Sequence, residues 1–343
     1  MRRPLAPSRL LAALFAVLAL LVTCACSPVG AHASGSATPA PGTITVGLTY
    51  QPDIQFAPFY VADSQGWFAQ AGLHVTLRHH GSSETLFGAF QAGTEQVVFA
   101  GGDEMMQARA QGVDITDFAT IYQTYPVVLI VPASSSIHTL ADLRGRSIGI
   151  PGPYGENWFA LQVMLASANL TQADVHIVNI GYTQQAALTA KRVDAVVGFS
   201  NNDVINFQQA GFPVRQLTTP TPMPLIGSGL GASPTLLGAH PAQLTTFLSV
   251  VRRGVQYCID HPQDAVRLSA RYVPGLSDSA QQTRALATLT ATIPLYGTGD
   301  QIGRQDAALW AQMSQFMQQQ GLLATPVPAA QAFTSAIAGS HQA

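Results

Sequence analysis

Lysine is nearly missing from this sequence, and charged side chains of either sign are scarce. The 343 residues include one lysine, Lys191, charged residues make up only 10% of the chain, and the formal net charge is −2. A surface of this kind has no basic field with which to attract nucleic acid or an anionic lipid headgroup. We therefore expect no nucleic-acid partner.

Cysteine is equally rare. Cys24 and Cys26 lie near the N-terminus, and Cys258 is the third and last cysteine of the chain. One cysteine in the folded part excludes a disulfide framework and a cysteine-based metal site. Cys258 lies in a helical pattern and is expected to be a buried packing residue.

His79 and His80 are neighbours on an expected strand and face opposite sides of it, so we predict no metal site and no cofactor.

Long hydrophobic runs are limited to one, at residues 10–22. Arg2 and Arg3 precede this run and small residues follow it, which is typical of a secretion signal, and the run is short for a membrane span. The sequence LVTC resembles the lipobox of bacterial lipoproteins, although Thr23 is atypical directly before Cys24. Cys26 follows Ala25, which is more typical of the position directly before the lipidated cysteine. This choice, however, places Thr23 three positions before the cysteine, where it is less typical, so either cysteine remains a candidate for lipidation.

The N-terminal segments predict an extracytoplasmic protein. Residues 1–26 are interpreted as a signal peptide with a lipobox, the alternative being an ordinary cleaved signal peptide. Residues 27–42 are small, proline-rich and uncharged, so they are expected to form a disordered tether. With a lipid anchor, the mature protein would stay attached to the membrane in the periplasm or at the cell surface.

Short strand patterns alternate with helical ones through the rest of the chain, which predicts an α/β fold. The expected strands lie at 43–50, 74–80, 96–102, 114–123, 127–132, 147–152, 175–181, 193–200 and 212–217. From residue 240 onward the pattern is helical, and these helices must pack on a lobe that already exists. We predict lobe 1 at 43–131 plus 226–331, lobe 2 at 132–225 and a tail at 332–343.

The stretch APFYVADSQGWFAQAGLHV, residues 57–75, combines aromatic side chains with interrupting glycines. Gly66 interrupts the helical pattern, and Gly72 is expected to end it in the left-handed conformation that favours glycine. The loop before this stretch follows the first strand. In open α/β sheets, ligands bind at the carboxyl ends of strands, so this loop is expected to face a ligand.

Several segments in a fixed order resemble one protein family. They are ITVGLTYQPDIQFAPFYVADSQGWFAQAGLHVTL, GSSETLFGAFQAGTEQVVFAGGDEMMQARAQGVDI, IHTLADLRGRSIGIPG and RVDAVVGF. The order resembles the extracytoplasmic substrate-binding proteins of ABC importers, in the SsuA/THI5-like or NMT1-like group that includes thiamine-pyrimidine, sulfonate and nitrate binders. The resemblance implies a type II periplasmic-binding-protein fold, with two lobes, each a mainly parallel sheet flanked by helices. It also implies a monomer that closes on a small solute and delivers it to permease subunits and, through them, an ATPase.

Loops after the strands supply the candidate ligand-binding residues. These are Gln51, Asp53, Phe56, Pro58, Ser82, Asp103, Glu104, Tyr122, Gln123, Tyr154, Gly155, Glu156, Asn157, Trp158, Asn201, Asn202 and Asp203, with Tyr125 and Tyr182 nearby. The set contains aromatics, amides and carboxylates but no lysine or arginine.

That absence of cations favours one ligand class. A buried sulfonate or nitrate needs charge-assisted donors, and Glu156 at a helix start would repel it. A flat heteroaromatic ring with N–H groups fits better, because aromatic side chains stack on it and carboxylates accept its protons. We predict a pyrimidine, a thiamine precursor or a flavin-like ligand, with an anion binder of the same family as the alternative.

An enzyme of the same fold is the alternative from another class. Fungal pyrimidine synthases resemble this family and carry a cysteine-rich active-site motif, which this chain lacks. No catalytic motif stands out elsewhere in the sequence. We therefore predict that the protein is not an enzyme and has no catalytic residues.

Overall fold

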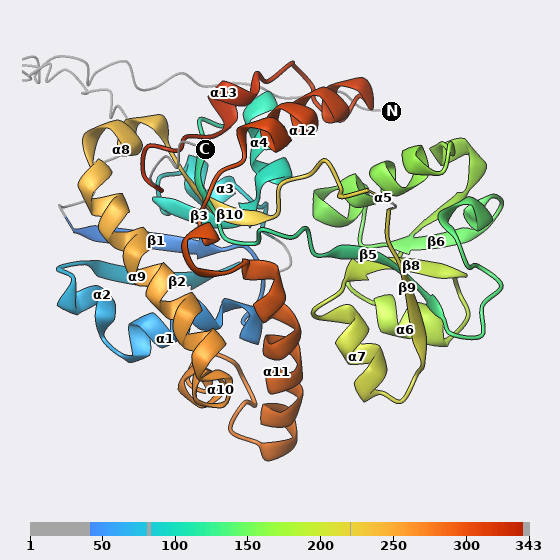
Figure 1. Cartoon of the computed structure of the whole chain (residues 1–343), viewed down its shortest axis with the longest axis horizontal. Helices are drawn as coiled ribbons and strands as arrows, with labels where there is room; N and C mark the ends of the chain where they lie inside the picture. Colours follow the sequence, from blue (N-terminus) through green and yellow to red (C-terminus); the bar gives the residue numbers. More distant parts are fainter. Residues whose placement is uncertain (1–41, 81–83, 220, 339–343) are drawn as a thin grey trace, which may run out of the picture. The chain divides into compact units, whose positions relative to one another are not determined.

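Two five-stranded sheets organise the chain (Figure 1). The computed structural model describes residues 42–80, 84–219 and 221–338; the predicted signal peptide, lipidation cysteines and most of the tether lie outside them, as does Ser82. The first sheet has the order β2-β1-β3-β10-β4 and comprises β1 (Thr43–Leu48), β2 (His74–His79), β3 (Val97–Gly101), β4 (Thr116–Thr120) and β10 (Ser228–Ala232). The second has the order β7-β6-β8-β5-β9 and comprises β5 (Val127–Pro132), β6 (Ser147–Ile150), β7 (His176–Asn179), β8 (Ala195–Phe199) and β9 (Val214–Leu217).

The two sheets share one plan. In each sheet, three adjacent strands pair in parallel: β2, β1 and β3 in the first sheet, and β7, β6 and β8 in the second. One strand, β10 or β5, runs antiparallel to both of its neighbours. Four of the five strands in each sheet therefore point the same way. The predicted α/β class with two helix-flanked sheets is confirmed, with one reversed strand in each sheet making it mixed.

Strand β5 corrects the predicted lobe boundary. Residues 127–131 were assigned to lobe 1, but β5 pairs with β8 and β9 in the second sheet, where Val127 lies opposite Phe199. The chain therefore crosses to the second sheet at residues 121–126. Every residue of β5 except the last is buried, and a strand that is apolar on both faces carries no pattern that assigns it to one sheet.

Helices cover both faces of each sheet. Those around the first sheet are α1 (Ala57–Ser64), α2 (Trp67–Gln70), α3 (Gly88–Gln91), α4 (Gly102–Ala110), α8 (Pro234–Ala239), α9 (Pro241–Asp260), α10 (Pro262–Ser269), α11 (Ser279–Thr292), α12 (Ala307–Gln319) and α13 (Ala329–Ala332). Those of the second are α5 (Gly155–Ser167), α6 (Gln184–Thr189) and α7 (Asp203–Gln209). Short 3-10 turns lie at η1 (Ile54–Phe56), η2 (Leu140–Leu143), η3 (Gln172–Asp174), η4 (Ile293–Tyr296) and η5 (Gly299–Gln301).

Alternating side chains of the central strands build separate cores. Val97 and Phe99 of β3 pack with α1 and α9, whereas Val98 and Ala100 pack with α3 and α4. The long helix α9 lies beside α1 in Figure 1, and a Cβ on Gly254 of α9 would come within 2.2 Å of the Pro58 carbonyl oxygen. Gly254 therefore lets the two helices approach closely. Side chains of the C-terminal helices α9, α10 and α11 share one core with β1, β3 and β10 of the first sheet.

The glycines of residues 57–75 behave as the sequence predicts. Gly66 has φ +66° and separates α1 from α2, and Gly72 has φ +75° at the turn into β2. Both angles lie in the left-handed region that side chains disfavour. The break turns one long apolar segment into two short helices, which bury Phe59, Tyr60 and Trp67 against α9 and α10.

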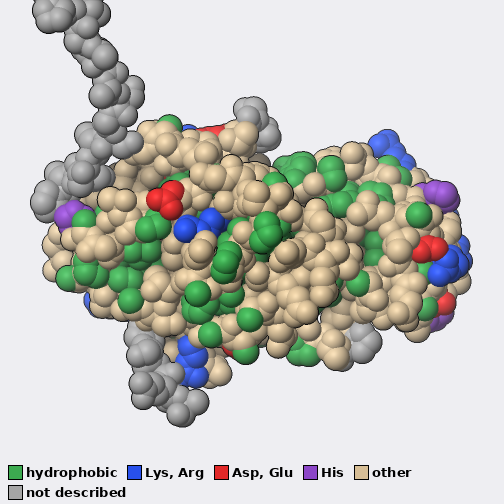
Figure 2. Space-filling model, turned by 90° about the horizontal axis from the view of Figure 1, so that it is seen from above, with side chains coloured by type: hydrophobic (Ala, Val, Ile, Leu, Met, Phe, Trp, Pro, Cys, Tyr) green, Lys and Arg blue, Asp and Glu red, His purple; other side chains and the backbone are tan. Residues whose placement is uncertain are grey.

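The surface carries few charges, as the composition predicts. Figure 2 shows isolated acidic and basic side chains separated by wide areas of uncharged ones. Lys191 is exposed and has φ +56°, directly after α6. Cys258 is buried, as predicted. Among the described residues, no helix has both the length and the apolar character that a bilayer span requires.

Candidate functional site

Two chain segments connect the sheets and lie side by side. The backbone N–H groups of Ile121 and Tyr122 donate to the carbonyl oxygen of Ser228 at 3.0 and 2.9 Å. A Cβ on Gly227 would lie 2.6 Å from the Tyr122 carbonyl oxygen, so glycine is what allows this approach. These two connecting segments place the carboxyl ends of strands from both sheets, and the loops that follow them, in one region.

Three carboxyl groups from the two lobes meet at the starts of α4 and α5. Asp103 and Glu104 belong to the first turn of α4, and Glu156 belongs to that of α5. Tyr125, on the first crossing, donates its hydroxyl to Asp103 Oδ2 at 2.6 Å and to the Glu156 carbonyl oxygen at 3.1 Å. Asp103 is fully buried and Glu156 is 8% exposed.

These carboxyl groups hold their protons more tightly than usual. Burial raises the pKa of Asp103 and of Glu156 well above the ordinary range, and the neighbouring acids add to both rises. Burial also raises the pKa of Glu104, to about 7, against the hydrogen bonds that its carboxylate accepts. The cause is common to all three: negative charge is removed from water with no cation to balance it.

A second acidic pair, Asp53 and Asp203, acts on Tyr50, and Asp53 also acts on Tyr122. Asp53 accepts from the Gln55 backbone N–H at 3.1 Å, and Asp203 accepts from that of Phe199 at 2.7 Å. Burial raises the pKa of each carboxyl to about 6, and the Asp53 charge adds to the rise at Asp203. Burial first, and then the charges of Glu156 and Asp53, raise the pKa of Tyr122. The two acidic groups therefore form one continuous acidic region.

Amide side chains of the second lobe complete this region. Asn201 donates from Nδ2 to Thr292 Oγ1 at 2.9 Å, and Asn202 donates to Gln55 Oε1 at 3.2 Å, so both bridge the lobes. The Oδ1 atoms of Asn201 and Asn157 are buried and have no hydrogen-bond partner among the residues that the structure describes. A buried acceptor without a donor is costly, and a ligand N–H or O–H group would satisfy it.

Three tyrosines stand at the solvent side of the region. Tyr154 and Tyr182 are 53% and 55% exposed, and the Tyr182 ring meets that of Tyr50 edge to face at 5.6 Å. Partial burial raises the pKa of Tyr182 to about 12, and the nearby Tyr154, Tyr50 and Glu104 add to the rise. Sequence reasoning missed Tyr50, although it directly precedes Gln51 at the end of β1.

Other predicted site residues make contacts within the protein, and their part in binding stays a prediction. Phe56 packs edge to face against Tyr60, and Pro58 lies under α9. Gln123 donates to the backbone carbonyl oxygens of Thr120 and Arg304 at 2.6 and 3.1 Å. Trp158 packs on the second-lobe core. Gln51 is exposed and reaches the Tyr50 hydroxyl, while Gly155, with φ +71°, starts α5.

Cations are absent from this acidic region. Across the part of the chain that the structure describes, no arginine or lysine bonds to Asp53, Asp103, Glu104, Glu156 or Asp203, and no cluster of His, Cys, Asp and Glu could hold a metal ion. The oxygen atoms of this region can therefore accept hydrogen bonds from a neutral or cationic guest. It offers no side chain that would neutralise an anion.

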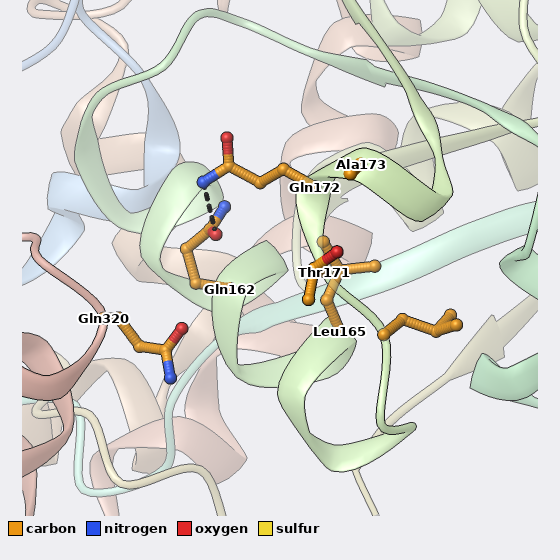
Figure 3. A pocket seen from close by; sticks show the side chains of 7 residues that line it. Gln162, Leu165, Thr171, Gln172, Ala173 and Gln320 are labelled. Atoms are coloured by element: carbon orange, nitrogen blue, oxygen red, sulfur yellow. Dashed lines mark hydrogen bonds between the residues drawn. The ribbon is translucent and has the colours of Figure 1, made fainter.

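A separate hollow of about 270 Å³ lies between α5, the segment that follows it and Gln320 after α12 (Figure 3). It is lined by Gln162, Leu165, Leu170, Thr171, Gln172, Ala173 and Gln320. Gln172 donates to Gln162 Oε1 at 2.9 Å across it. None of the predicted site residues lines this hollow, so it is distinct from the acidic region.

Comparisons with known proteins agree on one family. The family model described as NMT1/THI5 like matches residues 53–265. The riboflavin-binding protein RibY of Chloroflexus aurantiacus is 32% identical over 340 residues, covering 93% of this chain and 95% of that protein. A 4-amino-5-hydroxymethyl-2-methylpyrimidine phosphate synthase of Legionella pneumophila is 23% identical, covering 76% and 84%. The periplasmic aliphatic sulphonate binding protein SsuA of Escherichia coli has the same fold, with a TM-score of 0.69 at 16% identity, covering 85% and 92%.

Proposed function

Because the chain belongs to the NMT1/THI5-like family, we propose that it is the extracytoplasmic solute-binding component of an ABC importer and takes a flat heteroaromatic solute between its lobes. A flavin of the riboflavin type is the ligand that the relatives favour, since RibY is named for riboflavin. The protein would act as a monomer and pass the solute to permease subunits, which an ATPase drives. Pyrimidines and thiamine precursors belong to the same chemical class.

The observation that carries this proposal is the number of oxygen atoms in the acidic region that can accept hydrogen bonds. Five carboxyl groups and the unpartnered Oδ1 atoms of Asn157 and Asn201 gather there without a cation. A guest with several N–H or O–H groups satisfies these acceptors. The ring of such a guest can stack on the tyrosines at the solvent side, which contributes roughly 0.5–1.5 kcal/mol per contact beyond area burial.

Export is supported by the sequence alone. The apolar run at residues 10–22 after Arg2 and Arg3 matches a signal peptide, and Cys24 or Cys26 would carry the lipid in an anchored form. The proposed location is the periplasm or the cell surface. The mass of the mature chain isolated from membranes would identify the modified cysteine, because acylation adds fatty-acid mass to one N-terminal residue.

Two other functions are weaker. A sulfonate binder shares the fold, but the acidic region lacks the positive side chains that hold a desolvated anion. A pyrimidine synthase is represented among the relatives, but this chain has three cysteines and two of them lie in the predicted signal region. Dependence on iron would favour the enzyme, whereas reversible binding without turnover would favour the solute-binding protein.

Riboflavin is expected to stabilise the purified mature protein. At a riboflavin concentration a hundredfold above the dissociation constant, the free energy of unfolding should rise by about 2.7 kcal/mol. Denaturant titration with and without riboflavin measures the rise, and quenching of flavin fluorescence measures the affinity. Methanesulfonate and nitrate serve as comparison ligands. Stabilisation by methanesulfonate while riboflavin and pyrimidines have no effect would overturn the proposed ligand class.

Tyr182→Ala is expected to weaken riboflavin binding by about two- to tenfold. The loss corresponds to one aromatic contact of roughly 0.5–1.5 kcal/mol. Val178→Ala is the matched control, because Val178 is a partly exposed residue of the same lobe, on β7, outside the tyrosine group. Equal affinities for the two variants would place the ring of the ligand away from Tyr182.

A further inference from the structure

Two helices from different lobes begin next to each other at the acidic region. Helix α4 starts after Gly101 and α5 starts after Tyr154, and neither of these preceding residues caps its helix with a side chain. The first N–H groups of a helix have no partner within the helix, and they attract negative charge. Two such starts facing one region would form a binding site for a small anion.

Glu104 already occupies this position with its own carboxylate. Its Oε2 accepts from the Gly101 backbone N–H at 2.9 Å, at the start of its own helix. Its Oε1 lies so close to Gly155 that a Cβ there would be 2.9 Å away. The Glu156 backbone N–H lowers the pKa of this carboxyl, against the rise that burial causes. One carboxylate therefore caps α4 in the first lobe and lies against the start of α5 in the second.

Glu156 makes the reverse contact. Its Cγ and Oε1 would lie 2.9 and 3.0 Å from a Cβ on Gly101, and Oε1 accepts from Ser228 Oγ at 3.4 Å. Each glutamate thus lies against a glycine at the start of the opposite helix. Both glycines are needed for this arrangement, because any side chain there would displace the facing carboxylate.

We propose that Glu104 is a specificity-determining residue, an internal anion that fills the paired helix starts and thereby excludes sulfonates and other small oxyanions from the acidic region. The proposal rests on the proposed solute-binding function and defines which solutes it rejects. An incoming sulfonate would have to displace the Glu104 carboxylate from the Gly101 backbone N–H and from the space beside Gly155. A neutral guest with N–H or O–H groups does not compete with this carboxylate.

The neighbouring groups support this assignment. Asn157, in the same first turn of α5, is 9% exposed and has an unpartnered Oδ1, so the oxygens around this helix start outnumber the donors. The Tyr125 hydroxyl already donates a hydrogen bond to Asp103. No neighbouring side chain is therefore placed to neutralise a second negative charge.

The test measures methanesulfonate binding by calorimetry to the full mature chain and to Glu104→Gln and Glu104→Ala variants. The glutamine keeps the size of the side chain and removes its charge, and the alanine also removes its bulk. Asp114→Asn is the matched control, since Asp114 is an exposed residue of the first lobe and its substitution changes the net charge equally. Circular dichroism and denaturant unfolding establish that each variant is folded.

Both Glu104 variants are expected to bind methanesulfonate at least about tenfold more tightly than the unsubstituted chain and Asp114→Asn, a change of about 1.4 kcal/mol or more. Folded Glu104 variants that bind methanesulfonate no better than the control would overturn the proposal. So would binding of equal strength by the unsubstituted chain.

Riboflavin binding by the unsubstituted chain is a separate measurement and decides the proposed function. If riboflavin fails to bind while the Glu104 variants gain methanesulfonate, the ligand class is wrong and the role of Glu104 stands. If riboflavin binds and the variants gain nothing, the ligand class stands and the role of Glu104 is wrong.

Discussion

Replacing Trp310 with alanine is expected to lower the free energy of unfolding by about 3–5 kcal/mol. Trp310 on α12 is fully buried, its ring stacks on Phe333 at 5.3 Å, and its Nε1 donates to Gln305 Oε1 at 2.7 Å. A Cβ on Gly102 would lie 3.0 Å from the ring, so the indole fills the space beside the start of α4. Its loss leaves a large cavity and removes one of the two hydrogen bonds that Gln305 Oε1 accepts, the other coming from Thr120 Oγ1.

The size of this effect follows from where the ring lies. The same core contains Met106 of α4 together with Phe159 and Val163 of α5, so Trp310 joins side chains of both lobes. Denaturant unfolding measures the loss. Trp310→Phe should lose less because it keeps a ring beside Phe333, and Gln318→Ala, exposed on the same helix, should change stability little. A loss below about 1 kcal/mol for the alanine variant would contradict this account.

Asp117→Asn is expected to remove a pH-dependent loss of stability. Asp117 on β4 is fully buried, its Oδ1 accepts from the Ala119 N–H at 2.9 Å and from Gln305, and its Oδ2 has no partner. Burial raises the pKa of this carboxyl to about 7. The folded protein then holds a proton that the unfolded chain releases near pH 4, so this group makes stability fall as pH rises from about 4 to about 7.

The comparison between the variant and the unsubstituted chain isolates this group. Glu104 titrates near 7, and Asp53 and Asp203 near 6, so the total stability of both proteins falls over the same range. Between pH 5 and pH 8, the stability advantage of Asp117→Asn should grow by about 3 kcal/mol, since one pKa unit is worth about 1.4 kcal/mol. Asp114→Asn, at an exposed site, is the control. An advantage that is constant with pH would mean that Asp117 stays ionised when folded.

Local sequence patterns were enough to predict most elements of the fold. Strand alternation and helical spacing depend on neighbouring residues, and the breaks at Gly66 and Gly72 follow from backbone geometry that glycine alone adopts easily. Pairing between distant strands is different. Val127 lies opposite Phe199, and no property of either segment specifies that partner. The sheet to which β5 belongs was therefore predicted wrongly.

The candidate site was predicted in part, for a similar reason. Loops after strands converge in this kind of fold, so Asp53, Glu156 and Asn201 were expected in one region, and the structure brings them together around Tyr122. Whether an aromatic or proline in such a loop faces a cleft or a core depends on helices much later in the chain. Pro58 packs under Gly254, almost 200 residues away, so the pattern around Pro58 could not reveal that role. Their part in binding stays a prediction.

The position of Lys191 makes the protein convenient for optical work. It is the chain's one lysine and is exposed just after α6, so, once the N-terminal amine is blocked, an amine-reactive dye marks the second lobe at a single side chain. Two of the three tryptophans, Trp67 and Trp310, belong to helices that pack with the first lobe. Energy transfer from these indoles to a dye on Lys191 would follow the distance between the lobes without any engineered residue.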